Sequence, residues 1–240
     1  MKSKSVEMLL KGAKEFGINI EMFHVEQFNK YYELLVEWNK KMNLTAIIEE
    51  EEVVIKHFLD SLSTYKCGKM KGNEQIIDVG TGAGFPALPL KIVFPFLKIT
   101  LLDSSKKRTM FLHHIVEELN LQEVNVIHGR AEDIGKDSAY REKFDVCVAR
   151  AVASLNVLLE YTLPFVKVDG YFVALKGREI EEEMVNSQRA LKELKGSVEE
   201  IIKIDIPYSN IVHHLIVVKK IDTSPIKYPR RPNAIQKSPL

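Results

Sequence analysis

The sequence has few cysteines, no excess of either charge and no long apolar run. Its two cysteines, Cys67 and Cys147, are far apart in the chain, so we expect no disulfide framework. Basic residues number 34 and acidic residues 33, which leaves a formal net charge of +1. Any nucleic-acid partner therefore needs a local basic patch, because the chain has no overall field to attract it. The most apolar window, residues 87–102, is interrupted by two prolines and two lysines, which predicts that it does not span a membrane.

The first 65 residues lack proline and contain little glycine, which predicts helices. Apolar and aromatic residues recur there at steps of three and four, and we expect the helix face that they form to be buried: Phe28, Tyr31, Leu35, Trp38 and Met42. We see no apolar leader with a small-residue cleavage site, so we expect a cytoplasmic protein without a signal peptide. A glycine- and lysine-containing linker, residues 66–73, follows.

From residue 74 onward, the pattern changes to alternating strands and helices. The expected strands are residues 76–79, 98–103, 123–128, 144–149, 171–176, 198–206 and 211–220, the last two as an antiparallel pair. This alternation predicts an α/β fold with a mostly parallel sheet flanked by helices. We therefore divide the chain into an N-terminal helical extension (1–66), a sheet domain (74–221) and a C-terminal arm (222–240). The arm has four prolines and four basic residues, which predict an extended basic segment.

The stretch QIIDVGTGAGF, which starts at residue 75, combines a buried strand, a glycine-rich turn and a helix start. Open α/β sheets bind nucleotide-like cofactors at such turns, although the glycines alone also suit a plain tight turn. Gly80, Gly82 and Gly84 are spaced G-x-G-x-G, and Phe85 stands where a dinucleotide fingerprint has its third glycine. Asp78 suits a cationic ligand group better than a pyrophosphate. These features favour S-adenosylmethionine, which carries an ammonium and a sulfonium, over a dinucleotide.

Charged residues also follow the next three expected strands. Asp103 closes the second strand, where a carboxylate can take both ribose hydroxyls of such a cofactor or cap the next helix. Ala131 and Glu132 follow the third strand, where they can hold an adenine, or Glu132 can cap a short helix. Arg150 directly follows the fourth strand. A buried arginine at this place needs a partner. Arg150 is also the best single candidate for a contact with the substrate.

Several longer motifs are spread over nearly the whole chain. They are VEWNKKMNLTAI (36–47), KHFLDSL (56–62), DVGTGAGFPALPL (78–90), LLDSSKKRTMFL (101–112), HGRAED (128–133), ARAVASL (149–155), ALKG (174–177), YPRRP (228–232) and KSPL (237–240). In combination they resemble the bacterial 16S ribosomal RNA guanine-N7 methyltransferases, formerly called glucose-inhibited division protein B. Two departures occur: Ala87 stands where a second glycine is common, and Asn233–Gln236 replaces a Gly-Thr-Pro-containing tail segment.

The resemblance implies a class I methyltransferase with a Rossmann-like sheet. Such an enzyme transfers a methyl group from S-adenosylmethionine to N7 of one guanine in the decoding-region loop of 16S rRNA. By matching positions, the resemblance implies cofactor contacts by Gly80, Phe85, Ala131, Glu132 and Arg150, with Asp103 on the ribose. It also implies that Arg130, Arg150 and Lys176 serve RNA handling and activity.

The chemistry of guanine N7 sets few demands on the protein. At neutral pH the N7 nitrogen carries an unprotonated lone pair, so we expect no general base. We predict that Arg150 and Lys176 position the substrate. We predict RNA contacts by basic residues that can equally be solvated surface: Lys106, Lys107, Arg108, Arg130, Arg178, Arg230 and Arg231. We expect a monomer without a metal site, acting on 16S rRNA or the small ribosomal subunit. The alternatives are a methyltransferase for another RNA or a small molecule, and a non-catalytic RNA-binding protein.

Overall fold

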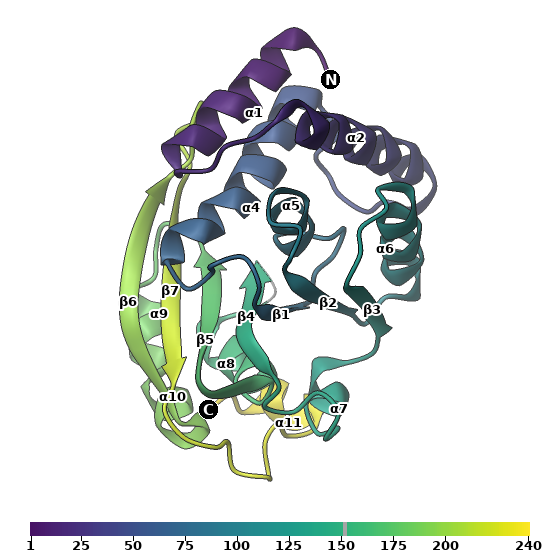
Figure 1. Cartoon of the computed structure of the whole chain (residues 1–240). Helices are drawn as coiled ribbons and strands as arrows, with labels where there is room; N and C mark the ends of the chain where they lie inside the picture. The colour runs from purple at the N-terminus through teal and green to yellow at the C-terminus, as the bar shows by residue number, and fades with distance from the viewer. Residues whose placement is uncertain (151–152) are drawn as a thin grey trace.

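The computed structural model describes residues 1–150 and 153–240 (Figure 1). Ala151 and Val152, which belong to the ARAVASL motif, lie outside the described residues. No helix in the described part of the chain has the length and apolar content needed to cross a bilayer.

A seven-stranded sheet in the order β3-β2-β1-β4-β5-β7-β6 forms the centre of the molecule. Its strands are β1 (Gln75–Val79), β2 (Lys98–Asp103), β3 (Val124–His128), β4 (Phe144–Arg150), β5 (Val166–Lys176), β6 (Gly196–Asp205) and β7 (Val212–Lys220). Strands β1 to β5 pair in parallel, whereas β7 pairs antiparallel with both β5 and β6. The predicted mostly parallel sheet with an antiparallel C-terminal pair is confirmed. β1 and β6 start one and two residues earlier than predicted, and β5 starts five residues earlier, at Val166. This longer β5 includes Asp169 at a φ of +66°.

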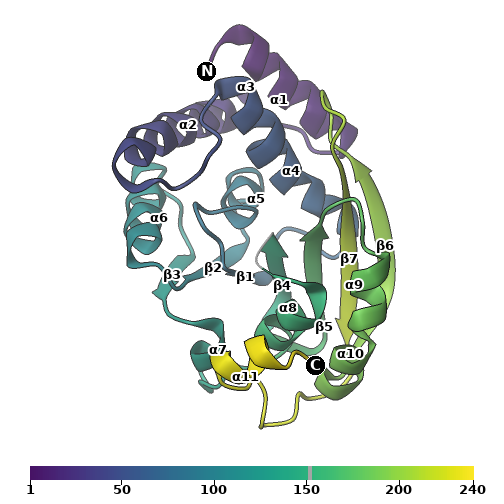
Figure 2. The ribbon, with the colours of Figure 1, turned by 180° about the vertical axis from the view of Figure 1, so that it is seen from behind.

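Helical layers cover both faces of the sheet (Figures 1 and 2). One layer consists of α1 (Ser3–Glu15), α2 (Met22–Met42), the continuous helical segment Glu50–Cys67, which includes α3 (Glu50–Val53), a π-helical turn (Val54–Leu59) and α4 (Asp60–Leu62), then α5 (Ala87–Val93) and α6 (Lys106–Glu118). The other consists of α7 (Ala131–Ile134), α8 (Leu155–Thr162), α9 (Glu181–Asn186), α10 (Gln188–Leu194) and α11 (Pro232–Lys237).

The N-terminal helices share their hydrophobic core with the sheet. Phe28 and Phe58 from these helices are fully buried in one continuous cluster with Ile76 of β1 and Val148 of β4. The predicted apolar face of α2 therefore packs on the sheet and its flanking helices. This packing fixes the helical segment 50–67 beside the carboxyl ends of the strands, where the candidate site lies.

The C-terminal residues 222–240 differ from the extended arm that the sequence predicts. Residues 232–237 form helix α11, which packs against α8. Tyr228, Ile235 and Leu240 are buried. These apolar side chains give the tail a hydrophobic contact surface, which its proline and charge content does not reveal.

Candidate active site

A two-lobed crevice lies at the carboxyl ends of β1, β2 and β4, where strand order reverses between β1 and β4. The smaller lobe has a volume of about 150 Å³ and the larger about 440 Å³. Gly80, Asp103 and Ser104 line both lobes, so the two form one continuous site. A crevice at a topological switch point is the usual ligand site of open α/β sheets.

The glycine turn forms the floor of the larger lobe. Gly80, Gly82 and Gly84 have φ angles of +72°, +64° and +100°, in the region that favours glycine. At Gly84 space is also restricted, because an added Cβ would lie 2.6 Å from the hydroxyl of Tyr31. The turn therefore needs glycine at all three positions for its conformation, and at Gly84 for close packing as well.

Asp78 lies beneath this turn and is fully buried. Its Oδ2 accepts hydrogen bonds from the Thr81 hydroxyl at 2.8 Å and from the Ala87 N–H at 3.1 Å, which ties the start of α5 to β1. Its Oδ1 has no hydrogen-bond partner among the described residues. Burial raises the pKa of Asp78 to about 7. Asp78 thus braces the turn from below, and the predicted direct contact with a cofactor stays a prediction.

Tyr31 of α2 holds the turn from the other side, a role that the sequence does not signal beyond the burial of this residue. Its hydroxyl donates to the carbonyl of Ala83 at 2.5 Å, and its ring stacks on Phe85 with centroids 5.3 Å apart. Phe85, the residue in the position of the third glycine, lines the larger lobe. An N-terminal helix is therefore part of the site's construction.

Asp103 is at the junction of the two lobes, as its position at the end of β2 predicts. Its Oδ2 accepts from the Gly82 N–H at 2.9 Å, and its Oδ1 accepts from the Ser105 N–H at 2.8 Å. Arg108 lies 3.5 Å from the same Oδ2 and also lines the larger lobe. The carboxylate is almost completely buried yet borders both lobes.

The smaller lobe is closed by the residues that follow β3. Arg130, Ala131 and Glu132 line it, in agreement with the predicted position of the last two, and Arg130 lies 3.5 Å from the Glu132 carboxylate. Tyr161 of α8 completes the wall from the opposite side, and sequence reasoning missed it. Its position becomes evident only when α8 is placed against α7.

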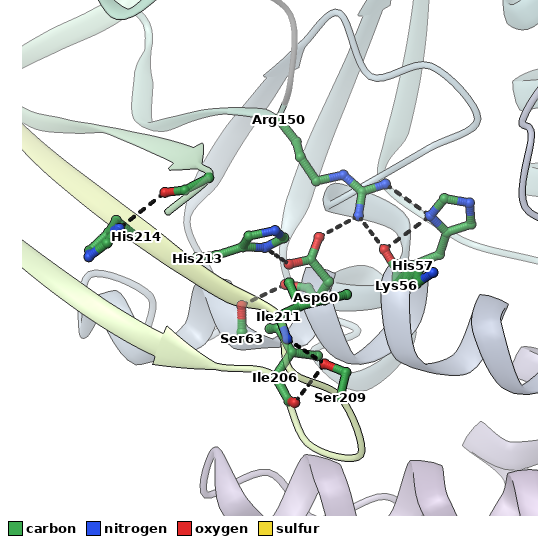
Figure 3. A network of polar contacts seen from close by, with 11 residues as sticks. Lys56, His57, Asp60, Ser63, Arg150, Ile206, Ser209, Ile211, His213 and His214 are labelled. Carbon is green, nitrogen blue, oxygen red and sulfur yellow. Dashed lines mark hydrogen bonds and ion pairs between the residues drawn. The ribbon is translucent and has the colours of Figure 1, made fainter. Parts of the chain in front are cut away.

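Arg150 lies at the end of β4 in a network of polar contacts with the N-terminal helical segment (Figure 3). Its Nη1 donates to Oδ2 of Asp60 at 2.7 Å and to the carbonyl of Lys56 at 3.1 Å. Its Nη2 donates to Nδ1 of His57 at 3.3 Å, and its Cζ lies 5.1 Å from the Phe85 ring centroid. The partner that a buried arginine requires is thus Asp60, which the sequence analysis did not identify.

Asp60 is buried and also accepts a hydrogen bond from Nδ1 of His213 on β7, at 2.5 Å. Burial acts to raise the pKa of Asp60, but the bond from His213 and the charge of Arg150 outweigh it and hold the pKa below its ordinary value. The carboxylate therefore stays ionised and connects β4, β7 and the helical segment.

His57 borders the larger lobe and is a neutral imidazole at pH 7. Burial and the adjacent Arg150 guanidinium lower its pKa to about 4. Its Nε2 lies 2.9 Å from the Thr45 hydroxyl, and its ring stacks on Phe85 with centroids 4.5 Å apart. The π-helical turn Val54–Leu59 brings His57 and the Lys56 carbonyl to the crevice, in keeping with the frequent occurrence of such turns at functional sites.

Lys176 at the end of β5 is not among the residues that line the two lobes. Its Nζ donates to the carbonyl of Ala153 at 2.7 Å and pairs with Glu183 at 2.6 Å. Glu183 also accepts from the Leu155 N–H at 2.7 Å. Lys176 and its partner Glu183 therefore hold Ala153 and the start of α8, one strand away from Arg150.

The predicted RNA-contacting residues fall into two groups. Lys106, Lys107, Arg108, Arg130, Arg178 and Arg231 are exposed. Arg230 instead forms an ion pair with the fully buried Glu160, so its guanidinium is bound to a carboxylate inside the protein. Within the described residues, no group of three or more His, Cys, Asp or Glu side chains is arranged to hold a metal ion.

The family model for GidB, described as rRNA small subunit methyltransferase G, matches residues 24–212. The chain belongs to the GidB family. It is 73% identical over the full length of both chains to "Ribosomal RNA small subunit methyltransferase G" of Thermoanaerobacter sp. (strain X514). It is 60% identical, also over the full length of both, to the protein of that name from Caldanaerobacter subterraneus subsp. tengcongensis. The family predicted from the motifs is confirmed.

Solved structures show the same fold at low sequence identity. Fibrillarin of Aeropyrum pernix, solved with natively bound S-adenosyl-L-methionine, has a TM-score of 0.51 at 16% identity, covering 62% of this chain and 67% of its own. M. jannaschii TYW2 in complex with AdoMet has a TM-score of 0.51 at 16% identity, covering 68% of this chain and 77% of its own. The predicted Rossmann-like fold is confirmed.

Proposed function

We propose that the protein transfers the methyl group of S-adenosylmethionine to N7 of a guanine in the decoding-region loop of 16S rRNA. The proposal rests mainly on the 73% and 60% sequence identity, over the full length, to proteins named rRNA small subunit methyltransferase G. The two-lobed crevice at the switch point of the sheet supports it. As part of the same proposal, the enzyme acts as a monomer in the cytoplasm, on 16S rRNA or the small ribosomal subunit.

The donor set of the crevice fits this cofactor. The Asp103 carboxylate borders both lobes, where it can accept hydrogen bonds from the ribose hydroxyls. Asp78 lines neither lobe, and its buried Oδ1 has no partner among the described residues, so Asp78 supports the glycine turn from inside the protein. When bound, S-adenosylmethionine supplies a methyl group that its sulfonium has already activated for transfer.

The protein's own residues then bind and orient the guanine. At neutral pH the N7 nitrogen carries a free lone pair, so no side chain has to remove a proton. Correct placement of N7 therefore supplies most of the rate enhancement. Arg150 lines the larger lobe, and its N–H groups suit guanine O6 or a nearby phosphate. Asp60, His57 and the Lys56 carbonyl fix the direction of this guanidinium. Lys176 contributes by holding the Ala153 carbonyl, just before α8.

The test is transfer of labelled methyl from S-adenosylmethionine to naked 16S rRNA, to assembled small subunits and to an unrelated RNA. We expect one labelled N7-methylguanine in the decoding region of 16S rRNA, mapped by chemical cleavage at that base. Label in the unrelated RNA alone would support a methyltransferase with another substrate. Cofactor binding without transfer to any acceptor would overturn the enzymatic proposal.

A further inference from the structure

The smaller lobe of the crevice has two walls that come from different parts of the chain. Helix α7 supplies Ala131 and Glu132, and α8 supplies Tyr161. The two helices contact one another, and the C-terminal helix α11 contacts α8. Both views of the ribbon place α7, α8 and α11 at the same end of the molecule (Figures 1 and 2).

Arg141 ties the tail to the α7 wall. Its Nη1 donates to the carbonyl of Gly135, the residue after α7, at 3.0 Å and to that of Tyr228 at 2.8 Å. Its Nη2 donates to the carbonyls of Ser224 at 2.8 Å and Pro225 at 3.3 Å. One guanidinium thus collects four carbonyl groups and fixes the tail along the outside of the α7 segment.

Arg230 ties the same tail to the α8 wall. Its Nη2 pairs with Oε2 of Glu160 at 2.6 Å, its Nε donates to Oε1 at 2.9 Å, and its backbone N–H donates to Oε1 at 2.8 Å. Such bidentate pairing fixes orientation more firmly than a single contact. Glu160 is fully buried and directly precedes Tyr161 in α8. The tail therefore holds the helix that presents Tyr161 to the lobe.

We propose that Tyr161 contacts the adenosine part of the bound cofactor, and that Arg141 and Arg230 are positioning residues that hold its helix against α7. This inference rests on the proposed function, because it presumes S-adenosylmethionine in the crevice. A half-buried tyrosine offers a ring on which a base stacks and a hydroxyl that can form a hydrogen bond at the lobe's edge. The tail thus serves the cofactor site, whereas its composition suggests an RNA-binding arm.

Tyr161 is tested by calorimetric titration of the full-length protein with S-adenosylhomocysteine. We expect Tyr161→Ala to raise the Kd about tenfold or more, the effect of a lost base–aromatic contact, and Tyr161→Phe to raise it less. A Kd for Tyr161→Ala within twofold of wild type would overturn the inference while leaving the proposed function intact. A wild-type protein that binds no S-adenosylhomocysteine would instead overturn the proposed function.

The tail is tested in the same assay with Arg141→Ala, which leaves no buried charge unpaired, and with Arg230→Ala. We expect each to raise the Kd about fivefold, the equivalent of one ordinary hydrogen bond, with one site per molecule retained. The matched control is Lys237→Ala, on the exposed side of the same tail, which should leave the Kd unchanged. A purely structural role would lower the number of binding sites at constant Kd, and that result would contradict the positioning role.

Discussion

Arg150 contributes to two properties of the molecule, because its guanidinium contacts both the crevice and a buried carboxylate. Asp60 keeps only 3% of its side chain exposed and pairs with Arg150 at 2.7 Å. Removing one partner of a buried pair leaves an uncompensated charge, which costs more than the pair itself contributes. The stability and the activity effects of an Arg150 variant must therefore be separated.

We predict that Arg150→Ala lowers the free energy of unfolding by about 3 kcal/mol, because Asp60 stays buried without its cation. Methyl transfer should fall about 100-fold, because the guanine is no longer oriented. The double variant Asp60→Asn/Arg150→Ala should recover most of the stability and none of the activity. Urea unfolding and single-turnover methyl transfer measure the two effects. Recovery of the rate together with stability would remove Arg150 from substrate positioning.

Two buried groups of the site give stability opposite pH dependences. Burial raises the pKa of Asp78 from 3.8 to about 7. The contribution of this group to stability is therefore greatest at low pH and is lost as the pH rises from about 4 to 7. The pKa of His57 is lowered from 6.5 to about 4, so its contribution is lost as pH falls through this range. The two trends oppose each other in the wild type, and a variant is needed to separate them.

We predict that the free energy of unfolding of Asp78→Asn, measured relative to wild type, increases by up to about 4 kcal/mol when the pH is raised from 4 to 8. The reason is that asparagine never has to ionise in the buried position. The measurement is urea unfolding of both proteins at the two pH values. The control, Asp205→Asn, changes an exposed carboxylate and should give the same difference from wild type at both pH values. A difference for Asp78→Asn that does not depend on pH would contradict the raised pKa.

At the scale of elements, α2 and α6 pack antiparallel, and this packing brings a basic cluster of each helix to the same end of the pair. Gln27 of α2 donates to the carbonyl of Leu119, which follows α6, and Trp38 packs on Phe111 with ring centroids 5.7 Å apart. The end of α2 therefore lies beside the start of α6. We name this region the basic end of the helix pair; it contains Lys40, Lys41, Lys106, Lys107 and Arg108. Since Arg108 also lines the larger lobe, this end is the best candidate for binding RNA phosphates near the site.

We predict that the double variant Lys106→Gln/Lys107→Gln weakens binding of 16S rRNA and leaves S-adenosylhomocysteine binding unchanged. The slope of log K against log salt should become shallower by about 1 to 2, because fewer counterions are released. Filter binding at several salt concentrations measures this slope. The control Lys11→Gln/Lys14→Gln removes the same charge from α1 and should have no effect. Equal effects of both variants would indicate a general charge effect without a docking surface.

Elements with a strong local signal could be predicted from the sequence, whereas contacts between remote segments could not. The strands around the glycine turn follow from buried runs and turn residues, and Asp103 follows from its place at a strand end. Asp60 has no such signal, because its partners Arg150 and His213 are 90 and 153 residues away. The tail was predicted from its composition, but its conformation depends on partners such as Glu160, which lies 70 residues from Arg230.

At the scale of the whole molecule, the shared core connects the N-terminal helices to the sheet. Phe28 of α2 and Val148 of β4 belong to one buried cluster, and Tyr31 holds the glycine turn by its hydrogen bond to Ala83. The N-terminal helices therefore bury their apolar face only when the sheet is folded. Cooperative unfolding of both parts follows from this arrangement.

We predict a single unfolding transition for the whole chain. Trp38, the one tryptophan of the sequence, is on α2 and packs against Phe111 and His114 of α6, so its fluorescence reports on the helical layer. Far-UV circular dichroism reports on the helices and the sheet together. The two curves should coincide in urea, and S-adenosylhomocysteine at about 100 times its Kd should stabilise both by about 2.7 kcal/mol. An earlier fluorescence transition, unaffected by the ligand, would show that the N-terminal helices unfold independently and that Tyr31 does not couple them to the cofactor site.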